Sequence, residues 1–479
     1  MRSCNQSENR LGFSMYWSYS MNHSKHEKGQ ALILIVLAIF GLIGLTGLTI
    51  DGGNAYSDRR HAQNAADAAV MAAALTKVRG GDWHAAGMAR AADNSYDNNG
   101  TSNIVQVVSP PISGVYAGNP DYIQVLIESH VDTYFAKVVG IFQMTNRVQA
   151  IAKTKLSEIG PLFDGQALVA LKPDGTTFTT CGNPNVNIDL SGIFVNSSSD
   201  CAMDVQGNVD MSVDTGYAIV NATSPVCTNG TVNMEGPISG GAEQVDYPPR
   251  VDLAAPSEID CGKLSAGSYD KATNTFSPGI YNSIKITNGT QHFAPGEYCI
   301  NGDVAISGGS VDINFAQFQL NAGEFLVKGN ADFGAYHTVF SAPEDGTFTG
   351  FHFNGTGDIT VEESTFYLGS GGLELNGDAD NTFTAPTDPN APNNGMLIYM
   401  PYGNTSNLVI NGNADSTFTG TILGVSAPIT VYGNSNSEAI SSQIIGYTVE
   451  VCGNSDLNMS FDPGVNFQQL EPAKMGLIE

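Results

Sequence analysis

Basic residues are scarce in this chain of 479 residues. It holds 20 Lys and Arg against 47 Asp and Glu, which gives a formal net charge of −27. Only six of the basic residues follow residue 175, namely Arg250, Lys263, Lys271, Lys285, Lys328 and Lys474. A nucleic-acid-binding protein needs a concentrated basic patch to hold the phosphate backbone, so we expect no nucleic-acid partner. The uneven charge predicts a nearly neutral N-terminal part and a separate, acidic C-terminal part.

Motifs that carry catalysis are missing as well. The sequence has no HExxH, Gly-x-Ser-x-Gly, P-loop or Cys-x-x-Cys spacing, and no EF-hand loop or nonapeptide calcium repeat. What remains is isolated acids and histidines: Asp378 with Asp380, Glu362 with Glu363, and His292, His337 and His352. Glycoside hydrolases use a pair of carboxyl groups, so the paired acids are of the right type for such an enzyme. Neighbouring carboxylates on turns are, however, typical of a solvated surface. The histidines are expected on strand faces. We therefore expect no enzyme, no cofactor and no metal site beyond loose surface binding of calcium.

One long apolar run lies near the N-terminus. Ala31–Ile50 carries no charge, and about 20 apolar residues are what a helix needs to cross a bilayer. A signal peptide has a shorter apolar core and a small-residue cleavage site, so we expect a retained anchor over 29–51. Lys25 and Lys28 precede the run, which places the tail 1–28 in the cytoplasm and the rest of the chain outside.

The following residues predict a small α+β module over 52–158, just outside the membrane. Ser57–Val78 is rich in alanine and is expected to be helical, with a kink at Gly52 and Gly53 after the membrane span. Strand-like runs follow at Ile104–Val108, Tyr122–Ile127 and Val148–Ala152.

Four short motifs surround and follow the apolar run. They are Gly29-Gln30-Ala31, Asp51-Gly52-Gly53, the pair Arg59-Arg60, and the run Gln63-Asn64-Ala65-Ala66-Asp67-Ala68-Ala69. Together with Tyr116–Ile141, they resemble the N-terminal region of Flp pilus-assembly TadE/TadG-like proteins, over residues 27–156. The resemblance implies a single-span envelope protein that serves a tight-adherence pilus, with Flp/Tad pilus-assembly components as partners.

One position departs from the pattern of a processed pilin. Prepilins that are cleaved after a glycine carry a Glu five residues into the mature chain. Counted from Gln30, that position is Leu34. The apolar residue favours permanent membrane anchoring over cleavage at Gly29 and incorporation into the fibre.

A repeat dominates the acidic part over 177–465, between a Gly- and Pro-containing linker at 159–176 and a tail at 466–479. Its unit is apolar-x-apolar-x-Gly, and the glycines are Gly207, Gly302, Gly329, Gly355, Gly377, Gly412, Gly433 and Gly453. From Gly302 onward most steps are 20 to 27 residues, the length of one coil of a parallel β-helix whose apolar side chains alternate inward. The single 35-residue step predicts a loop inserted between coils. A β-sandwich or propeller is the competing fold.

Asparagines and cysteines fit the same stacking. Asn follows the turn glycine at Asn208, Asn330, Asn413, Asn434 and Asn454, so stacked coils would place these amides in a ladder. Six of the seven cysteines fall in the exported part, and six thiols allow 15 pairings. Cys181 and Cys201 are about one coil apart, which makes them the candidate disulfide.

The sequence thus predicts an N-terminal transmembrane helix with a small α+β module, followed by a mainly-β parallel β-helix. The expected function is structural. We expect a membrane-anchored accessory or minor component of a Flp/Tad pilus system, which presents the solenoid for adhesion to a surface ligand or glycan, or for assembly. Two alternatives stay open: a carbohydrate-active β-helix enzyme at the cell surface, and a solenoid that assembles end to end into a scaffold.

Overall fold

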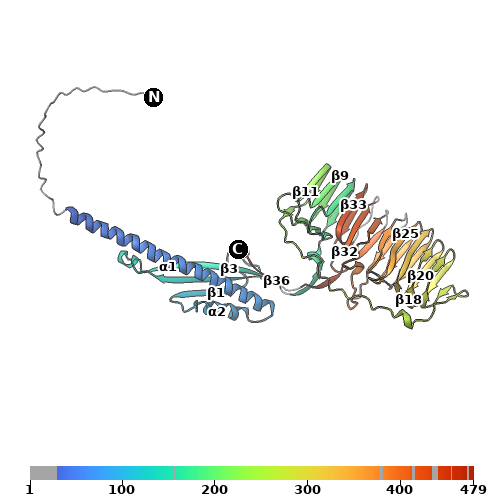
Figure 1. Ribbon diagram of the computed structural model, residues 1–479, viewed down its shortest axis with the longest axis horizontal. Coiled ribbons are helices and arrows are strands. Elements are labelled where there is room, and N and C mark those ends of the chain that lie inside the picture. The colour runs from blue at the N-terminus through green and yellow to red at the C-terminus, as the bar shows by residue number, and fades with distance from the viewer. Residues whose placement is uncertain are drawn as a thin grey trace, which may run out of the picture. The chain divides into compact units, whose positions relative to one another are not determined.

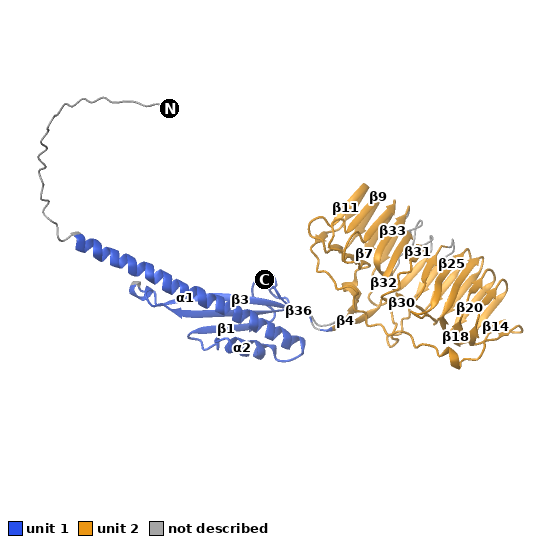
Figure 2. Ribbon diagram, viewed as in Figure 1, with its two compact units in different colours: residues 1–157, 473–479 blue, residues 158–472 orange. Residues whose placement is uncertain are grey.

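The structure is a computed structural model that divides into two compact units (Figures 1 and 2). Unit 1 comprises residues 1–157 and 473–479, and unit 2 comprises residues 158–472. The residues that it describes are 30–155, 157–376, 381–412, 416–433, 441–454, 456–471 and 474–478. The chain passes between the units twice, since both ends of its sequence belong to unit 1.

Unit 1 is a four-stranded antiparallel sheet with two helices. The sheet order is β1 (Asn103–Val108), β2 (Tyr122–Asp132), β3 (Gln143–Lys155) and β36 (Lys474–Ile478). The other elements are α1 (Gln30–Val78), α2 (Trp83–Asp93) and the 3-10 turn η1 (Ala136–Val139). Small side chains of α1, including Ala62, Ala66 and Ala73, are fully buried against apolar residues of the sheet. The alanine-rich run thus forms the packing face of the helix.

Helix α1 is continuous over 49 residues, so the predicted kink at Gly52 and Gly53 is wrong. Each glycine costs about 1 kcal/mol in a helix interior, but packing of the second half of α1 on the sheet offsets this cost. The first half, from Ala31, is long and apolar enough to cross a membrane, and almost all of its side chains are exposed. One helix therefore serves both as the candidate span and as part of the α+β module.

Unit 2 is a parallel β-solenoid with three faces, as the repeat predicted. Along most of the stack, each strand pairs in parallel with the strand three further along the chain, as β15 does with β18. Each coil therefore contributes one strand, or part of a longer bent strand, to each face. The repeat unit found in the sequence forms face 2, except for the unit Tyr298 to Ile300, which lies on face 1.

The strands divide among the faces as follows. Face 1 contains β5 (Leu168–Ala170), β8 (Gly192–Val195), β10 (Gly216–Ile219), β12 (Ile238–Gly240), β15 (Gly279–Tyr281), β18 (Gly296–Ile300), β21 (Ala316–Leu320), β24 (Val339–Ala342), β27 (Thr365–Leu368), β30 (Met396–Met400) and parts of β32 (Thr417–Gly433) and β33 (Ser441–Gly453). Face 2 contains β6 (Phe178–Gly182), β16 (Ile284–Ile286), β19 (Val304–Ile306), β22 (Ala322–Gly329), β25 (Thr347–Gly355), β28 (Gly372–Leu375), β31 (Leu408–Gly412), the first halves of β9 (Met203–Val213) and β11 (Val226–Glu235), and the last parts of β32 and β33. Face 3 contains β7 (Asn185–Asp189), β14 (Thr275–Phe276), β17 (Thr290–Phe293), β20 (Ser310–Asn314), β23 (Asp332–Tyr336), β26 (Ile359–Glu362), β29 (Asn381–Thr384), β34 (Asp456–Ser460), the second halves of β9 and β11, and the start of β32.

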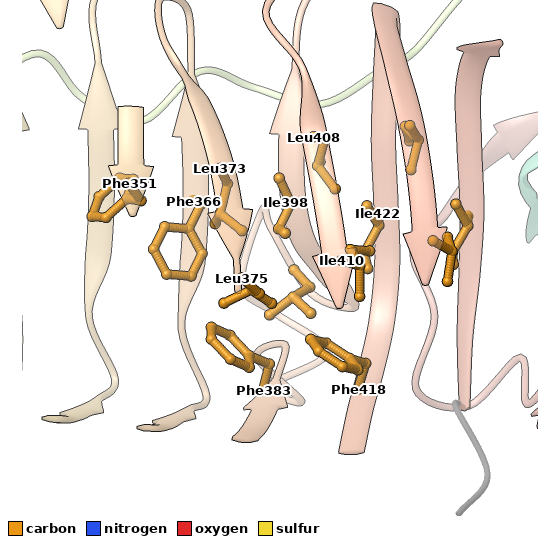
Figure 3. Close-up of a cluster of buried hydrophobic side chains, with 14 of the residues drawn as sticks. Phe351, Phe366, Leu373, Leu375, Phe383, Ile398, Leu408, Ile410, Phe418 and Ile422 are labelled. Atoms are coloured by element: carbon orange, nitrogen blue, oxygen red, sulfur yellow. The ribbon is translucent and has the colours of Figure 1, made fainter. Parts of the chain in front are cut away.

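Apolar side chains from the three faces fill the centre of every coil. Leu373 pairs in register with Leu408 of the next coil, and Figure 3 shows this interior row. On face 1 the ring of Phe340 lies 5.3 Å from that of Phe318 and 5.0 Å from that of Phe366, between centroids. Identical stacking from coil to coil explains why the sequence repeats at coil length.

The chain enters the solenoid in the middle of the stack. From β5 it builds coils toward one end and finishes them with β12, and residues 241–264 then lead to β13 (Tyr269–Asp270) at the other end. Later coils stack back toward the middle, where β33 and β34 pair with β5, β6 and β7. The last coil of the chain is therefore stacked on the first.

The connecting segment 241–264 covers face 1. Val245 and Val251 pack on the outward side of this face, which includes Ile445. Farther along, Gln319 Oε1 accepts a hydrogen bond from the Ile259 backbone N–H (2.8 Å). This cover explains why face 1 strands such as β8 are buried on both sides.

The two ends of the stack differ. One end carries the antiparallel hairpin β13–β14, where the ring of Phe276 lies 4.7 Å from Tyr269 and 6.0 Å from Tyr281, between centroids. At the other end, β11 pairs with β9 and β12 with β10, and Thr228–Thr231 is exposed. At the first end the hairpin covers face 3, but β16 (Ile284–Ile286) on face 2 pairs only with β19 among the described residues and leaves its outer edge open. The second end presents open strand edges as well, within the described part of the chain.

Short elements replace the predicted linker and tail, which are both wrong. Residues 159–176 contain most of β4 (Glu158–Pro161), the 3-10 turn η2 (Leu162–Gly165) and strand β5 of the first coil. Residues 466–479 contain β35 (Gln468–Glu471), which pairs with β4, and β36, which completes the sheet of unit 1. The ends of unit 2 thus form an antiparallel ribbon.

Candidate functional site

The α1 residues that end the apolar run hold a loop of unit 1. The Asp51 carboxylate is buried and accepts hydrogen bonds from the backbone N–H groups of Tyr134 (2.8 Å), Phe135 (3.0 Å) and Ala136 (2.7 Å). These are free N–H groups at the start of η1, so Asp51 caps this turn from another element. Gly47, one turn earlier, leaves room for the loop, because a Cβ at this position would lie 2.8 Å from Phe135 Cβ.

Asp58, two turns further along α1, ties the helix to the rest of unit 1. Its carboxylate accepts hydrogen bonds from Ser129 Oγ (3.0 Å), Asn146 Nδ2 (2.7 Å) and Tyr96 Oη (3.1 Å). Burial and then the charge of Asp58 raise the pKa of Tyr96 above its ordinary value. The phenol therefore stays protonated and donates to the carboxylate.

The remaining motif residues of α1 lie on two sides of the helix. Gln63 Nε2 donates to the Gln149 carbonyl oxygen (2.9 Å), and Ala66 is buried against the sheet. Arg59 and Arg60 are exposed, and within the described residues neither guanidinium has a hydrogen-bonding or ionic partner. Asp51, Asp58 and the alanines thus build the module, whereas the arginine pair is free to contact another molecule.

The first and last coils of unit 2 are joined on all three faces. Cys452 pairs in register with Cys181, and a disulfide links them with a Cα–Cα distance of 4.5 Å. Two residues after Cys181, Asn183 Nδ2 donates a hydrogen bond to Asn454 Oδ1 (2.9 Å). Covalent, backbone and side-chain contacts thus close the solenoid between residues that are 271 positions apart in sequence.

The predicted disulfide between Cys181 and Cys201 is wrong. The three disulfides join Cys181 with Cys452, Cys201 with Cys227, and Cys261 with Cys299. Cys181 does lie beside a cysteine of a neighbouring coil, but that coil comes from the far end of the sequence. Spacing along the chain identifies only sequential coils, so it could not reveal this partner.

Most of the repeat glycines stack at one corner, as predicted. The register pairs are Gly329 with Gly355, Gly412 with Gly433, Gly433 with Gly453, Gly453 with Gly182, and Gly207 with Gly230. Gly302 does not belong to this column, because the strand aligned with Phe325 on face 2 begins at Val304. Its own unit, Tyr298 to Ile300, lies on face 1 and carries the same apolar alternation. Gly377 lies outside the described residues.

The asparagine ladder forms where the first and last coils meet. Asn208 Nδ2 donates to Asn183 Oδ1 (2.9 Å), and Asn183 in turn donates to Asn454. The structure gives no such bond for Asn330, although it describes this residue. Asn413 and Asn434 lie outside the described residues.

The candidate catalytic residues are not brought together into one site. Glu363 accepts hydrogen bonds from Thr387 N (2.7 Å) and Thr387 Oγ1 (2.8 Å), so it holds the inserted loop. His352 Nδ1 lies 3.3 Å from Glu374 Oε2, and the His337 ring stacks on Phe315 in a turn instead of on a strand face. The other assignments are as follows: Glu362 ends β26, His292 Nδ1 lies 3.5 Å from Asp312 Oδ2, and Asp378 and Asp380 lie outside the described residues.

One group of potential metal ligands occurs in the described residues. Cys181, Glu450 and Cys452 place their ligand atoms within 4.8 Å of one another. Both sulfurs are used in the disulfide, and a disulfide offers no thiolate to a metal ion. The disulfide therefore leaves the half-buried Glu450 carboxylate as the one remaining ligand of this group, and a single carboxylate does not suffice for a metal site.

A comparison with protein families identifies the first helix. Residues 29–76 match a family model described as putative Flp pilus-assembly TadE/G-like. The match includes Asp51, Asp58 and the exposed arginine pair. No curated protein and no solved structure is significantly similar to the chain. Residues 29–76 are therefore similar to Flp pilus-assembly TadE/G-like domains, as the motifs in this segment predicted, and the same chain continues into a β-solenoid.

Proposed function

We propose that this protein is a membrane-anchored accessory or minor component of a Flp/Tad pilus system and that its solenoid serves adhesion or pilus assembly. The observation that carries the proposal is the joining of a TadE/G-like helix to a solenoid in one chain. The apolar half of α1 supplies the anchor. Lys25 and Lys28 before it favour a cytoplasmic N-terminus and an extracytoplasmic solenoid.

The outer surfaces of faces 2 and 3 support a binding role. Polar side chains recur there in register from coil to coil, as with Asp456, Asn185, Asp210 and Asn233 on face 3. Neighbouring strands are about 4.8 Å apart, so each row offers the same contact repeatedly along the stack. The acidic charge of the solenoid favours binding of a neutral glycan or a basic surface over binding of an acidic ligand.

We further propose that the solenoid acts without catalysis. Glu363 is occupied by its hydrogen bonds to Thr387, and the histidines contact single neighbours. A hydrolase needs two carboxyl groups facing one substrate bond. Depletion of purified neutral or acidic glycans by the protein would contradict this proposal.

The hairpin that partly covers one end of the stack disfavours an unlimited end-to-end scaffold. Head-to-tail stacking needs an open strand edge at both ends of the solenoid. The hairpin β13–β14 covers the face 3 edge at one end, while β16 leaves the face 2 edge open there. Filaments that lengthen with protein concentration would favour the scaffold instead.

The test is to locate the solenoid on intact cells. Cells are treated with protease, and sheared pili and membranes are blotted separately with an antibody to unit 2. We expect a solenoid that the protease digests and that stays with the membranes. Solenoid in the sheared fraction would make it a fibre subunit. Protection from protease on intact cells and on intact spheroplasts, with digestion only after lysis, would place the solenoid on the cytoplasmic side and contradict the proposal.

A further inference from the structure

A loop of unit 1 exposes several large apolar side chains. Between β2 and β3, the exposed fractions are 69% for Tyr134, 75% for Val138, 48% for Ile141 and 65% for Phe142. These residues fall within the segment 133–142, which we call the η1 loop. Exposed apolar residues gathered in one short segment mark a contact with another molecule or with a membrane.

The η1 loop is held in place at its base. Thr133 is 1% exposed, its N–H donates to the Phe142 carbonyl oxygen (3.1 Å), and its hydroxyl donates to the Ile141 carbonyl oxygen. The start of η1 is bound by the Asp51 carboxylate. The apolar side chains are therefore presented by a fixed backbone.

The contacts with Gly47 and Asp51 determine where the loop lies along the axis of α1, and so where it lies relative to the end of the apolar run. Gly47 lies against Phe135, and it precedes the end of the apolar run at Ile50 by three residues. At about 1.5 Å per residue, the loop begins about 5 Å inside the end of the run. Any bilayer that the run spans therefore reaches the η1 loop at its headgroup region.

We propose that the η1 loop is a second membrane contact and that its apolar side chains lie in the interface of the leaflet from which α1 emerges. This rests on the proposed function, which takes the apolar half of α1 as a membrane span. The loop then extends the lipid-facing surface that Leu45, Leu48 and Ile50 already present.

The composition of the loop fits a lipid interface. Tyr134 is an amphipathic aromatic residue of the kind enriched at membrane–water interfaces. Phe142 is of the kind that inserts its apolar ring into the interface. Lys137, on the same loop, is exposed and has a side chain long enough to reach lipid phosphates. Held at two points, α1 and the loop together would limit tilting of unit 1 on the membrane.

A second exposed apolar loop in unit 1 provides a matched control. Val115, 94% exposed, lies between β1 and β2. The base of this loop is bound to the far end of α1, where Lys77 Nζ donates to Ser109 Oγ (2.8 Å). Lys77 is 26 residues beyond Asp51, or about 39 Å along the helix, so Val115 should stay in water.

The experiment measures contact with lipid chains by tryptophan quenching. The full-length protein is reconstituted into vesicles of phosphatidylcholine and phosphatidylglycerol, with or without bromine on the acyl chains. Phe142→Trp reports on the η1 loop, Val115→Trp on the distant loop and Leu45→Trp on the span. The unsubstituted protein supplies the background of Trp17 and Trp83.

We expect brominated lipid to lower the added signal of Phe142→Trp and Leu45→Trp by about twofold or more, and to leave Val115→Trp unchanged. Quenching of Leu45→Trp alone would overturn the loop proposal and leave the anchor intact. Quenching of neither would overturn both. Protection of Phe142→Trp from iodide in water without quenching by lipid would show that a protein surface covers the loop, which also overturns the proposal.

Discussion

At the residue scale, the Asp51 carboxylate determines how the η1 loop is attached to α1. It accepts three backbone hydrogen bonds while almost fully buried. In Asp51→Asn, one oxygen is replaced by a donor that faces N–H groups. Because hydrogen bonds to a charged acceptor contribute about 1.5–3 kcal/mol, we expect a loss of roughly that size in the stability of the loop. Amide hydrogen exchange at residues 134–136, in lipid nanodiscs, should accelerate by about tenfold or more.

Asp93→Asn is the control for this substitution. Asp93 ends α2 and is exposed, so its replacement should leave exchange at 134–136 unchanged. Equal protection of these amides in Asp51→Asn and in the unsubstituted protein would contradict the role assigned to Asp51.

The exposed pair Arg59 and Arg60 gives a prediction about partners. Replacing both with alanine removes two charges that have no partner among the described residues. An exposed charge contributes little to the fold, so the double variant should reach the membrane in normal amounts while pili on the cell surface fall several-fold. Piliation is counted by electron microscopy, and Arg90→Ala, on the exposed side of α2, should retain normal piliation. Normal pilus numbers in the double variant would show that the pair does not serve assembly.

At the element scale, the stacked glycines give the sharpest prediction. Gly207 has φ of 108°, and a Cβ at this position would lie 1.7 Å from the Gly182 carbonyl oxygen, so the strands cannot keep their spacing. We expect Gly207→Ala to lower the free energy of unfolding of unit 2 by about 3 kcal/mol or more. Thermal unfolding of the full-length protein in detergent, followed by circular dichroism, measures the effect.

Gly403→Ala separates the effect of backbone angle from the effect of stacking. Gly403 has a similar φ of 101°, but a Cβ there has no neighbour within 4 Å. Only the cost of a left-handed backbone remains, which is about 1–2 kcal/mol. Similar losses in the two variants would mean that close stacking of the coils contributes little.

The same elements show what the sequence could reveal. Face 2 was predictable because its apolar alternation and its glycine recur once per coil. The TadE/G-like helix was predictable because its motifs are contiguous in the sequence. Strands β4 and β35 were not predictable, since each has four residues and its partner lies about 300 positions away. Gly302 was misplaced because face 1 carries the same apolar-x-apolar pattern as face 2. The continuity of α1 depends on packing that overrides two glycines.

At the scale of the whole molecule, the closure between the first and last coils should dominate stability. The disulfide Cys181–Cys452 spans 271 residues, whereas Cys201–Cys227 spans 26. By the entropy of loop closure, these would contribute about 5.6 and about 3.5 kcal/mol. Replacing both cysteines of the first pair with alanine should therefore lower the unfolding midpoint more than the same change in the second pair. A smaller effect would mean that the two coils stay close together in the unfolded ensemble without the disulfide, so that the cross-link removes less entropy.

The sequence could not reveal this closure, because a repeat states only that coils stack and not the order in which they stack. Three pairings across the junction, Ile445 with Val169, Val451 with Thr180 and Leu457 with Val186, look like any other step between coils. Only the three-dimensional structure shows that the chain enters and leaves the solenoid there. The same circumstance explains why the correct disulfide partner of Cys181 was missed.

Entry in the middle of the stack matters for a protein that is pulled. A solenoid held by its outermost coil can be unwound from that coil, one turn after another, because nothing lies beyond it. Here β4 and β35 leave from adjacent internal coils, and each of these is flanked by further coils and joined to the other by Cys181–Cys452. A force applied through the ribbon β4–β35 acts on the two coils that the disulfide Cys181–Cys452 joins, and not on an outermost strand of the solenoid. If the solenoid binds a surface, as proposed, shear on the cell would be transmitted through the junction of the first and last coils, where the disulfide joins them.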